Sequence, residues 1–145
     1  MAVLLDTNIL LRLLQPQHPH SAMTERALNI LRRRNETLNI ASQNLVECWA
    51  VMTRPTIENG LGLSVDAASI ELEKFKRLFV LLPELPLQDA WERLVVSYRV
   101  LGKNTHDARL VAAMTVHQVD SVLTFNIQDF TRYSGITALD PRTVV

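Results

Sequence analysis

The chain has 145 residues, of which 48% are hydrophobic, and this length and composition fit one globular domain (1–145) with a sizeable core. Its fifteen basic and fifteen acidic residues cancel, so no net charge draws the protein to nucleic acid or to a membrane surface. The single cysteine, Cys48, excludes an internal disulfide, and charges interrupt every apolar stretch before the roughly 18 residues of a membrane span. With no signal-peptide pattern at Met1–Leu5, we expect a cytoplasmic protein without membrane contact.

Short apolar segments alternate with longer amphipathic segments along the chain. Strands are expected at Val3–Leu5, Leu38–Ala41, Phe79–Leu82 and Val122–Thr124, with a weaker one at Ile136–Leu139. Helices are expected at Asn8–Leu14, Ser21–Arg34, Asn44–Thr53, from Ser64 or Asp66 to Leu78, from Pro86 or Leu87 to Val100, and at Thr105–His117. Ser21 is expected to cap the second of these helices, and Ser64 or Asp66 the fourth. The alternation predicts right-handed crossovers and therefore an α/β fold, a three-layer α/β/α sandwich around a parallel sheet of about five strands.

Four acidic residues stand just beyond apolar segments. Asp6 ends the first strand, Glu47 lies one turn into a helix, Asp107 opens another helix, and Asp129 follows the fourth strand. In open parallel sheets, sites form outside the carboxyl ends of the strands. Carboxylates gathered there would repel one another unless a cation joined them. Mg²⁺ or Mn²⁺ is the natural occupant, because hard divalent ions prefer oxygen ligands.

Each of these acids also has a local structural interpretation. Asp6, Thr7 or Asn8 is able to cap the helix that follows. Glu47 lies three residues after Asn44, so it is able to act as a capping-box partner at the start of its helix. Taken alone, the structural interpretation is as good as the functional one for Asp6 and better for Glu47.

Asp107 favours the functional interpretation. Thr105 is a plausible N-cap, which puts Asp107 in the first helical turn, where the helix dipole stabilises an anion. However, Asp107 shares a face with Leu110, Val111 and Met114, which lie three, four and seven residues further on. A carboxylate on the inward face of a core helix needs a partner, because burying an unpaired charge is costly.

The segment after the fourth strand offers Thr124, Asn126 and Asp129 as ligands or as groups that position ligands. Asn126 is equally suited to an Asx-turn, and Asp129 to capping a short helix that holds Phe130 in the core. The local pattern leaves both interpretations open.

Taken together, these segments resemble the PIN domain, and the chain is most similar to VapC-type toxins of bacterial toxin–antitoxin modules. The resemblance covers essentially the whole chain and depends on four segments in order: Asp6-Thr7-Asn8, Leu45-Val46-Glu47, His106–Ala113 and Leu123–Phe130. No single segment is specific, since strands ending in Asp-Thr-Asn are common. The combination carries the resemblance.

The resemblance implies a Mg²⁺- or Mn²⁺-dependent endoribonuclease with a cognate antitoxin, RNA as substrate and a homodimeric assembly. Asp6, Glu47 and Asp107 fall on the family's three core acidic positions. The fourth acidic position of the family corresponds to Asn126 or to Asp129, and the amide at Asn126 departs from the pattern. The expected site therefore has three groups of residues: Asp6, Glu47, Asp107 and Asp129 as catalytic residues, the first three of them as metal ligands, and Thr7, Asn8, Thr124 and Asn126 as positioning groups.

Basic residues give a weak signal for RNA. Arg32–Arg34 is the only basic run and is typical of a solvated helix end. Arg12, Arg54, Lys103 and Arg109 lie near the expected site in sequence terms and are candidates for phosphate contacts.

Two other functions compete with the nuclease. A receiver-like phosphoacceptor domain also gathers acids around Mg²⁺ on a parallel sheet, but it requires an Asp after the middle strand, where this chain has Leu82-Pro83-Glu84. A catalytically inactive PIN-like binding module is the second alternative. The set of Asp6, Glu47 and Asp107 argues against it, whereas Asn126 keeps it open.

Overall fold

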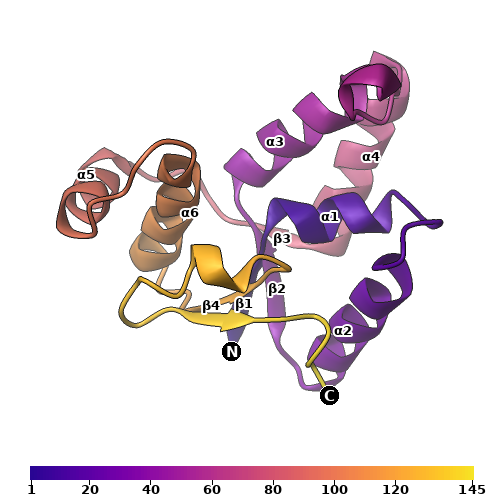
Figure 1. The fold of residues 1–145 in the computed structure, drawn as a ribbon. Coiled ribbons are helices and arrows are strands. Elements are labelled where there is room, and N and C mark those ends of the chain that lie inside the picture. The colour runs from indigo at the N-terminus through magenta and orange to yellow at the C-terminus, as the bar shows by residue number, and fades with distance from the viewer.

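Five short strands form one parallel sheet in the order β3-β2-β1-β4-β5 (Figure 1). The computed structural model describes all of residues 1–145. The strands are β1 (Ala2–Leu5), β2 (Thr37–Ile40), β3 (Val80–Leu81), β4 (Ser121–Leu123) and β5 (Thr137–Leu139). Strand β1 is central, with Leu4 opposite Asn39 of β2 and Val122 of β4.

Helices cover both faces of this sheet. The α-helices are α1 (Thr7–Leu13), α2 (Ser21–Arg33), α3 (Ser42–Thr53), α4 (Val65–Leu78), α5 (Gln88–Ser97) and α6 (Asn104–Val116), and short 3₁₀ turns lie at η1 (Thr56–Glu58) and η2 (Ile127–Asp129). In Figure 1, α5 and α6 stand together on the left and α1 to α4 on the right. None of the helices combines the length and apolar character that crossing a membrane requires.

The core is divided by the sheet into two apolar clusters. Side chains alternate along a strand, so Val3 and Leu5 of β1 join a cluster with α1 to α4, whereas Leu4 joins a cluster with α6 and Phe130. The prediction of a three-layer α/β/α sandwich with five parallel strands is therefore confirmed.

The strand order also decides between related α/β folds. Receiver domains of the flavodoxin type have the order 2-1-3-4-5, whereas here β1 lies between β2 and β4. The receiver-like alternative is therefore wrong. The direction of winding changes between β1 and β4, and the switch point of such a sheet is where sites form.

Several predicted helix starts differ from the observed ones by one or two residues. Ser21 and Thr105 are not N-caps, because α2 starts at Ser21 after His20 and α6 starts at Asn104 after Lys103. The capping prediction for Ser64 is confirmed, since its hydroxyl accepts a hydrogen bond from Ala67 N. The helix α5 ends at Ser97 rather than at Val100.

Candidate active site

Asp6 lies at the carboxyl end of β1 and is 7% exposed. Its Oδ1 accepts from Thr7 N at 2.8 Å, and its Oδ2 accepts from Thr124 Oγ1 at 2.7 Å. Burial raises the pKa of Asp6, an effect that these hydrogen bonds oppose and the nearby Asp129 strengthens. Asp6 therefore caps α1, as one interpretation predicted, and also faces the neighbouring acids.

The segment after β4 is tied to the start of α1. Asn8 Nδ2 lies 3.3 Å from Asp6 Oδ2 and 3.4 Å from Thr124 Oγ1. Asn8 Oδ1 accepts from Phe125 N at 3.4 Å, and Thr124 Oγ1 accepts from Asn126 N at 2.9 Å. These bonds hold Asp6 in one orientation from two segments 116 residues or more apart in sequence.

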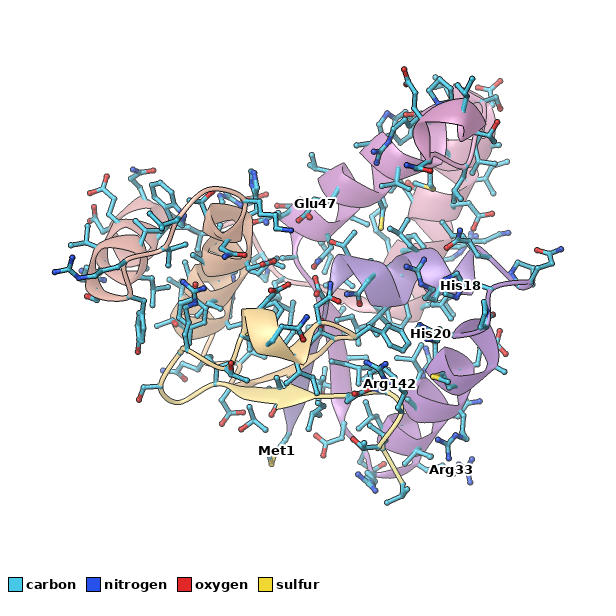
Figure 2. All side chains as sticks on the ribbon, viewed as in Figure 1. Met1, His18, His20, Arg33, Glu47 and Arg142 are labelled. Carbon is cyan, nitrogen blue, oxygen red and sulfur yellow. The ribbon has the colours of Figure 1, made fainter.

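Glu47 lies on α3, half-buried (Figure 2). Gln43 Nε2 donates to Glu47 Oε1 at 3.0 Å and to the carbonyl of His106 at 2.8 Å, so one side chain bridges α3 and α6. Burial raises the pKa of Glu47 and the charge of Asp6 adds to the effect, while Gln43 and His106 oppose it. The capping-box interpretation of Glu47 is wrong, because Asn44 lies inside α3 and its Oδ1 accepts from Ala41 N.

Asp107 occupies the first turn of α6 and accepts no hydrogen bond on its side chain. Leu110, Val111 and Met114, on the same face, are buried as expected. Burial raises the pKa of Asp107 to about 7, and the charges of Asp6, Asp129 and Glu47 add to the shift, whereas Lys103 opposes it. Asp107 is therefore electrostatically coupled to all three other acids.

The two candidates for the fourth acidic position differ in their surroundings. Asp129, at the end of η2, is half-buried, and its charge raises the pKa of both Asp6 and Asp107. The Asn126 side chain is exposed and makes no hydrogen bond. The negative charge of this segment thus comes from Asp129.

The four acids offer oxygen ligands suited to a hard divalent ion. No three acidic, His or Cys side chains already surround one point as a finished ligand set. The mutual repulsion that raises the pKa of Asp107 would nevertheless be relieved by a cation among them. The donor chemistry therefore fits Mg²⁺ or Mn²⁺, with carboxylates that must turn toward the ion.

Basic groups are unevenly placed around this edge. A depression of about 560 Å³ lies beside Glu47 and is lined by His106 and Arg109 among others. Arg109 Nη1 donates to Gln43 Oε1 at 3.2 Å. Arg12 instead donates to Gln15. Because Lys103 opposes the raised pKa of Asp107 and Arg109 is bonded to Gln43, these two are basic candidates that lie beside the acids.

Two polar residues of this site, Gln43 and Asn44, were missed from the sequence. Asn44 is fully buried, and its Nδ2 donates to Thr7 Oγ1 at 3.1 Å, which links α3 to α1. Their spacing from Glu47 was the available signal. Asn44 lies three residues before Glu47 and Gln43 lies four residues before it, so all three lie on one side of the first turns of α3.

Comparisons with known proteins bear on the family and the fold of the chain. The family model for the PIN domain matches residues 2–128. No curated protein matches the chain by sequence. The chain is similar in structure to VapBC2 from Rickettsia felis, solved bound to a DNA fragment from their promoter, with a TM-score of 0.73 and 16% identity over 97% of this chain and 98% of that one.

Two further solved structures show the same fold. VapBC-1 from nontypeable Haemophilus influenzae has a TM-score of 0.67 and 14% identity, with 99% of this chain and 100% of that chain covered. FitAcB from Neisseria gonorrhoeae has a TM-score of 0.67 and 18% identity, with 99% of each chain covered.

Proposed function

The chain belongs to the PIN domain family, and on that premise we propose that residues 1–145 form one PIN domain that acts as a Mg²⁺- or Mn²⁺-dependent endoribonuclease. Its substrate would be RNA, and its setting the cytoplasm. The same premise suggests that it is the toxin of a type II toxin–antitoxin pair and forms a homodimer.

One observation supports the nuclease proposal: carboxylates from four separate segments near the switch point of the sheet are electrostatically coupled, and Asp107 has no basic partner in an ion pair. Their coupling raises the pKa of Asp107 to about 7. A fold that needed these residues only for stability would gain by pairing them, because unpaired buried charge is costly. Strongly perturbed carboxylates at a sheet edge are typical of functional sites.

Asp6, Glu47 and Asp107 would hold the ion, with Asp129 adding negative charge beside them. A bound Mg²⁺ or Mn²⁺ would activate water and stabilise negative charge on the phosphodiester. Thr124 orients Asp6 through the bond from its hydroxyl to Oδ2, and Gln43 holds Glu47 toward α6. Asp6 is thus oriented on one side of the site, and on the other side Gln43 joins α3 to α6.

Substrate binding would use the α3–α6 side. The depression beside Glu47 is open, and Arg109 at its wall is exposed. A guanidinium is well suited to a phosphate oxygen. Since the net charge of the chain is zero, this local contact and the ion would provide the attraction for RNA that the whole protein lacks.

An antitoxin partner is proposed from the same similarity. The resemblance to VapC-type toxins implies a partner segment that covers the acidic edge, where an arginine would compete with the metal for the carboxylates. Expression in a bacterial host with and without the neighbouring reading frame tests this role. Growth arrest that the neighbouring frame relieves is expected, and unchanged growth would count against the toxin role but not against the nuclease.

The nuclease is tested by incubating an RNA pool with Mg²⁺, Mn²⁺ or EDTA and comparing wild type with Asp6→Asn. Asp89→Asn is the matched control, because Asp89 is an exposed acid on α5. Cleavage that requires metal, persists in Asp89→Asn and disappears in Asp6→Asn is expected. If folded protein, free of co-purified inhibitor, cleaves RNA neither with Mg²⁺ nor with Mn²⁺, the nuclease is refuted.

The inactive binding module is the second candidate, and two observations favour it. Asn126 presents an amide where the family has an acid, and the carboxylates do not already form a three-ligand set. A module of this kind would bind no Mn²⁺ in titration calorimetry. A nuclease would bind it through Asp6 and Asp107, so the metal titration separates the two candidates before any RNA is tested.

A further inference from the structure

Phe125, which directly follows Thr124, is held by residues from two distant parts of the chain. His20 directly precedes α2, and Asp140 and Arg142 come from the segment after β5. We call these four residues, His20, Phe125, Asp140 and Arg142, the clasp. Figure 2 labels His20 and Arg142, which approach this region from the two different segments.

Arg142 makes two kinds of contact with Phe125. Its Nη2 donates to the Phe125 carbonyl at 3.1 Å, and its guanidinium carbon lies 5.6 Å from the centre of the ring. The latter distance is within the range of a cation–π contact. Arg142 therefore restrains both the backbone and the side chain of Phe125.

Arg142 is itself restrained by Asp140. Its Nε lies 2.9 Å from Asp140 Oδ1 and 3.1 Å from Oδ2, and its backbone N–H donates to Oδ1 at 2.9 Å. Such charge-assisted bonds from one side chain fix a guanidinium more strictly than one exposed contact would. The arginine thus has a defined direction before it reaches Phe125.

His20 makes the remaining contact of the clasp. Its ring stacks on Phe125 with centroids 4.5 Å apart and planes inclined by 15°. The backbone N–H of His20 donates to His18 Nδ1 at 3.0 Å, which fixes the loop before α2. Phe125 is consequently held by the loop before α2 as well as by the segment after β5.

The clasp is connected to the acidic site by short paths. Phe125 N donates to Asn8 Oδ1, Thr124 Oγ1 donates to Asp6 Oδ2, and the same hydroxyl accepts from Asn126 N. A displacement of Phe125 would move Thr124 away from the carboxylate that it orients. Residues that hydrogen-bond to a metal ligand strongly affect metal affinity because they fix the orientation of that ligand.

We propose that Arg142 is a positioning residue for the acidic site, which acts through Phe125 and Thr124 to hold Asp6 in its orientation. This inference rests on the proposed function, because its effect is exerted on a metal ligand. Arg142 lies beyond residues 2–128, the part of the chain that the PIN domain model matches. It therefore adds a residue to the site from outside the matched region.

The first experiment measures Mn²⁺ affinity by titration calorimetry, together with RNA cleavage, in Arg142→Ala, Arg142→Lys and Arg33→Ala. Arg142→Ala should weaken Mn²⁺ binding by about threefold to tenfold. Arg142→Lys should recover part of the loss, because an ammonium is able to donate to the Phe125 carbonyl. Arg33, exposed at the end of α2, is the matched control and should have no effect.

A double-mutant cycle with Thr124→Val separates positioning from a general loss of stability. If Arg142 acts through the Thr124 hydroxyl, Arg142→Ala should change Mn²⁺ affinity much less in the Thr124→Val background. Additive effects on affinity would overturn the proposal. So would an Arg142→Ala variant with a lower Tm but unchanged Mn²⁺ affinity and cleavage rate.

Amide hydrogen exchange tests the clasp even if the proposed function fails. A wild-type protein that neither binds Mn²⁺ nor cleaves RNA would refute the nuclease. In that case Arg142→Ala should still speed exchange at Phe125 and Asn126, whose N–H groups donate to Asn8 and Thr124. Unchanged exchange at both residues in Arg142→Ala would refute the clasp itself.

Discussion

Asp107 and Asp140 are two carboxylates of one chain with opposite electrostatics. Burial opposes ionisation of Asp140, but bonds from the side chain and backbone of Arg142 outweigh it and lower its pKa. Burial also opposes ionisation of Asp107, and there the neighbouring acids add to the effect and raise its pKa to about 7. The fold pairs an acid where it fixes a segment and leaves acids unpaired where a cation is expected to bind.

The largest expected effect comes from removing the unpaired charge. Asp107→Asn keeps the shape of the side chain but removes a proposed metal ligand, so RNA cleavage should fall by at least about 100-fold. Asp89→Asn, the same substitution in the first turn of α5, should retain the wild-type rate. Initial rates at saturating Mg²⁺ measure both, and wild-type cleavage by Asp107→Asn would remove Asp107 from the site.

The same variant should be more stable than wild type when metal is absent. The raised pKa means that the folded protein favours protonated Asp107. The stability that protonation of Asp107 gives to the folded state is therefore complete below the unfolded pKa of 3.8 and is lost as pH rises through about 7. Because the side chain is only half-buried, we expect Asp107→Asn to gain about 1–2 kcal/mol at pH 8.

Urea unfolding in EDTA at pH 4 and pH 8 measures this difference. The gain from Asp107→Asn should be close to zero at pH 4, where wild-type Asp107 is largely protonated. Added Mg²⁺ should stabilise wild type at pH 8 and reduce the advantage of the variant. A variant less stable than wild type at pH 8 would contradict the unpaired state of Asp107.

Gln43→Ala tests the hydrogen bonds by which Gln43 joins α3 to α6 beside the unpaired acids. Without the bonds from Gln43 to Glu47 and to the His106 carbonyl, Glu47 loses its orientation, and cleavage should fall by about tenfold. Gln88→Ala is the matched control, since Gln88 donates to Glu92 four residues along α5. Equal activity in the two variants would show that the bridge has no role in the site.

The smallest effect is expected from breaking the ion pair between Asp140 and Arg142. Asp140→Asn removes a partly exposed ion pair, so Tm at pH 7 should fall by only a few degrees. Because the pKa of Asp140 is lowered, the stability that ionised Asp140 gives to the folded state is present above the unfolded pKa of 3.8 and is lost as pH falls through the folded pKa. Thermal unfolding in EDTA at pH 7 should therefore shift Tm in opposite directions for Asp140→Asn and Asp107→Asn, and shifts of the same sign would invalidate the comparison.

Much of the fold and part of the site were predictable from local patterns. Short apolar runs between amphipathic helices indicated the parallel sheet, and Asp107 on an apolar face indicated a buried acid without a local partner. Helix starts were less predictable, because several polar residues near each start compete for the cap. His20 and Lys103, rather than Ser21 and Thr105, occupy the N-cap positions of α2 and α6, although their side chains make no capping hydrogen bond.

The sequence by itself determined the apolar faces of the helices and strands, where strands end in acids, and that acids gathered there would repel one another, because these follow from side-chain periodicity and the electrostatics of neighbouring carboxylates. The tertiary structure decided which segments meet. Only the order β3-β2-β1-β4-β5 brings Thr124 beside Asp6, only the packing of α3 against α1 makes Asn44 a partner of Thr7, and only the fold of the last segment places Arg142 on Phe125. These contacts join residues far apart along the chain, so no local pattern records them.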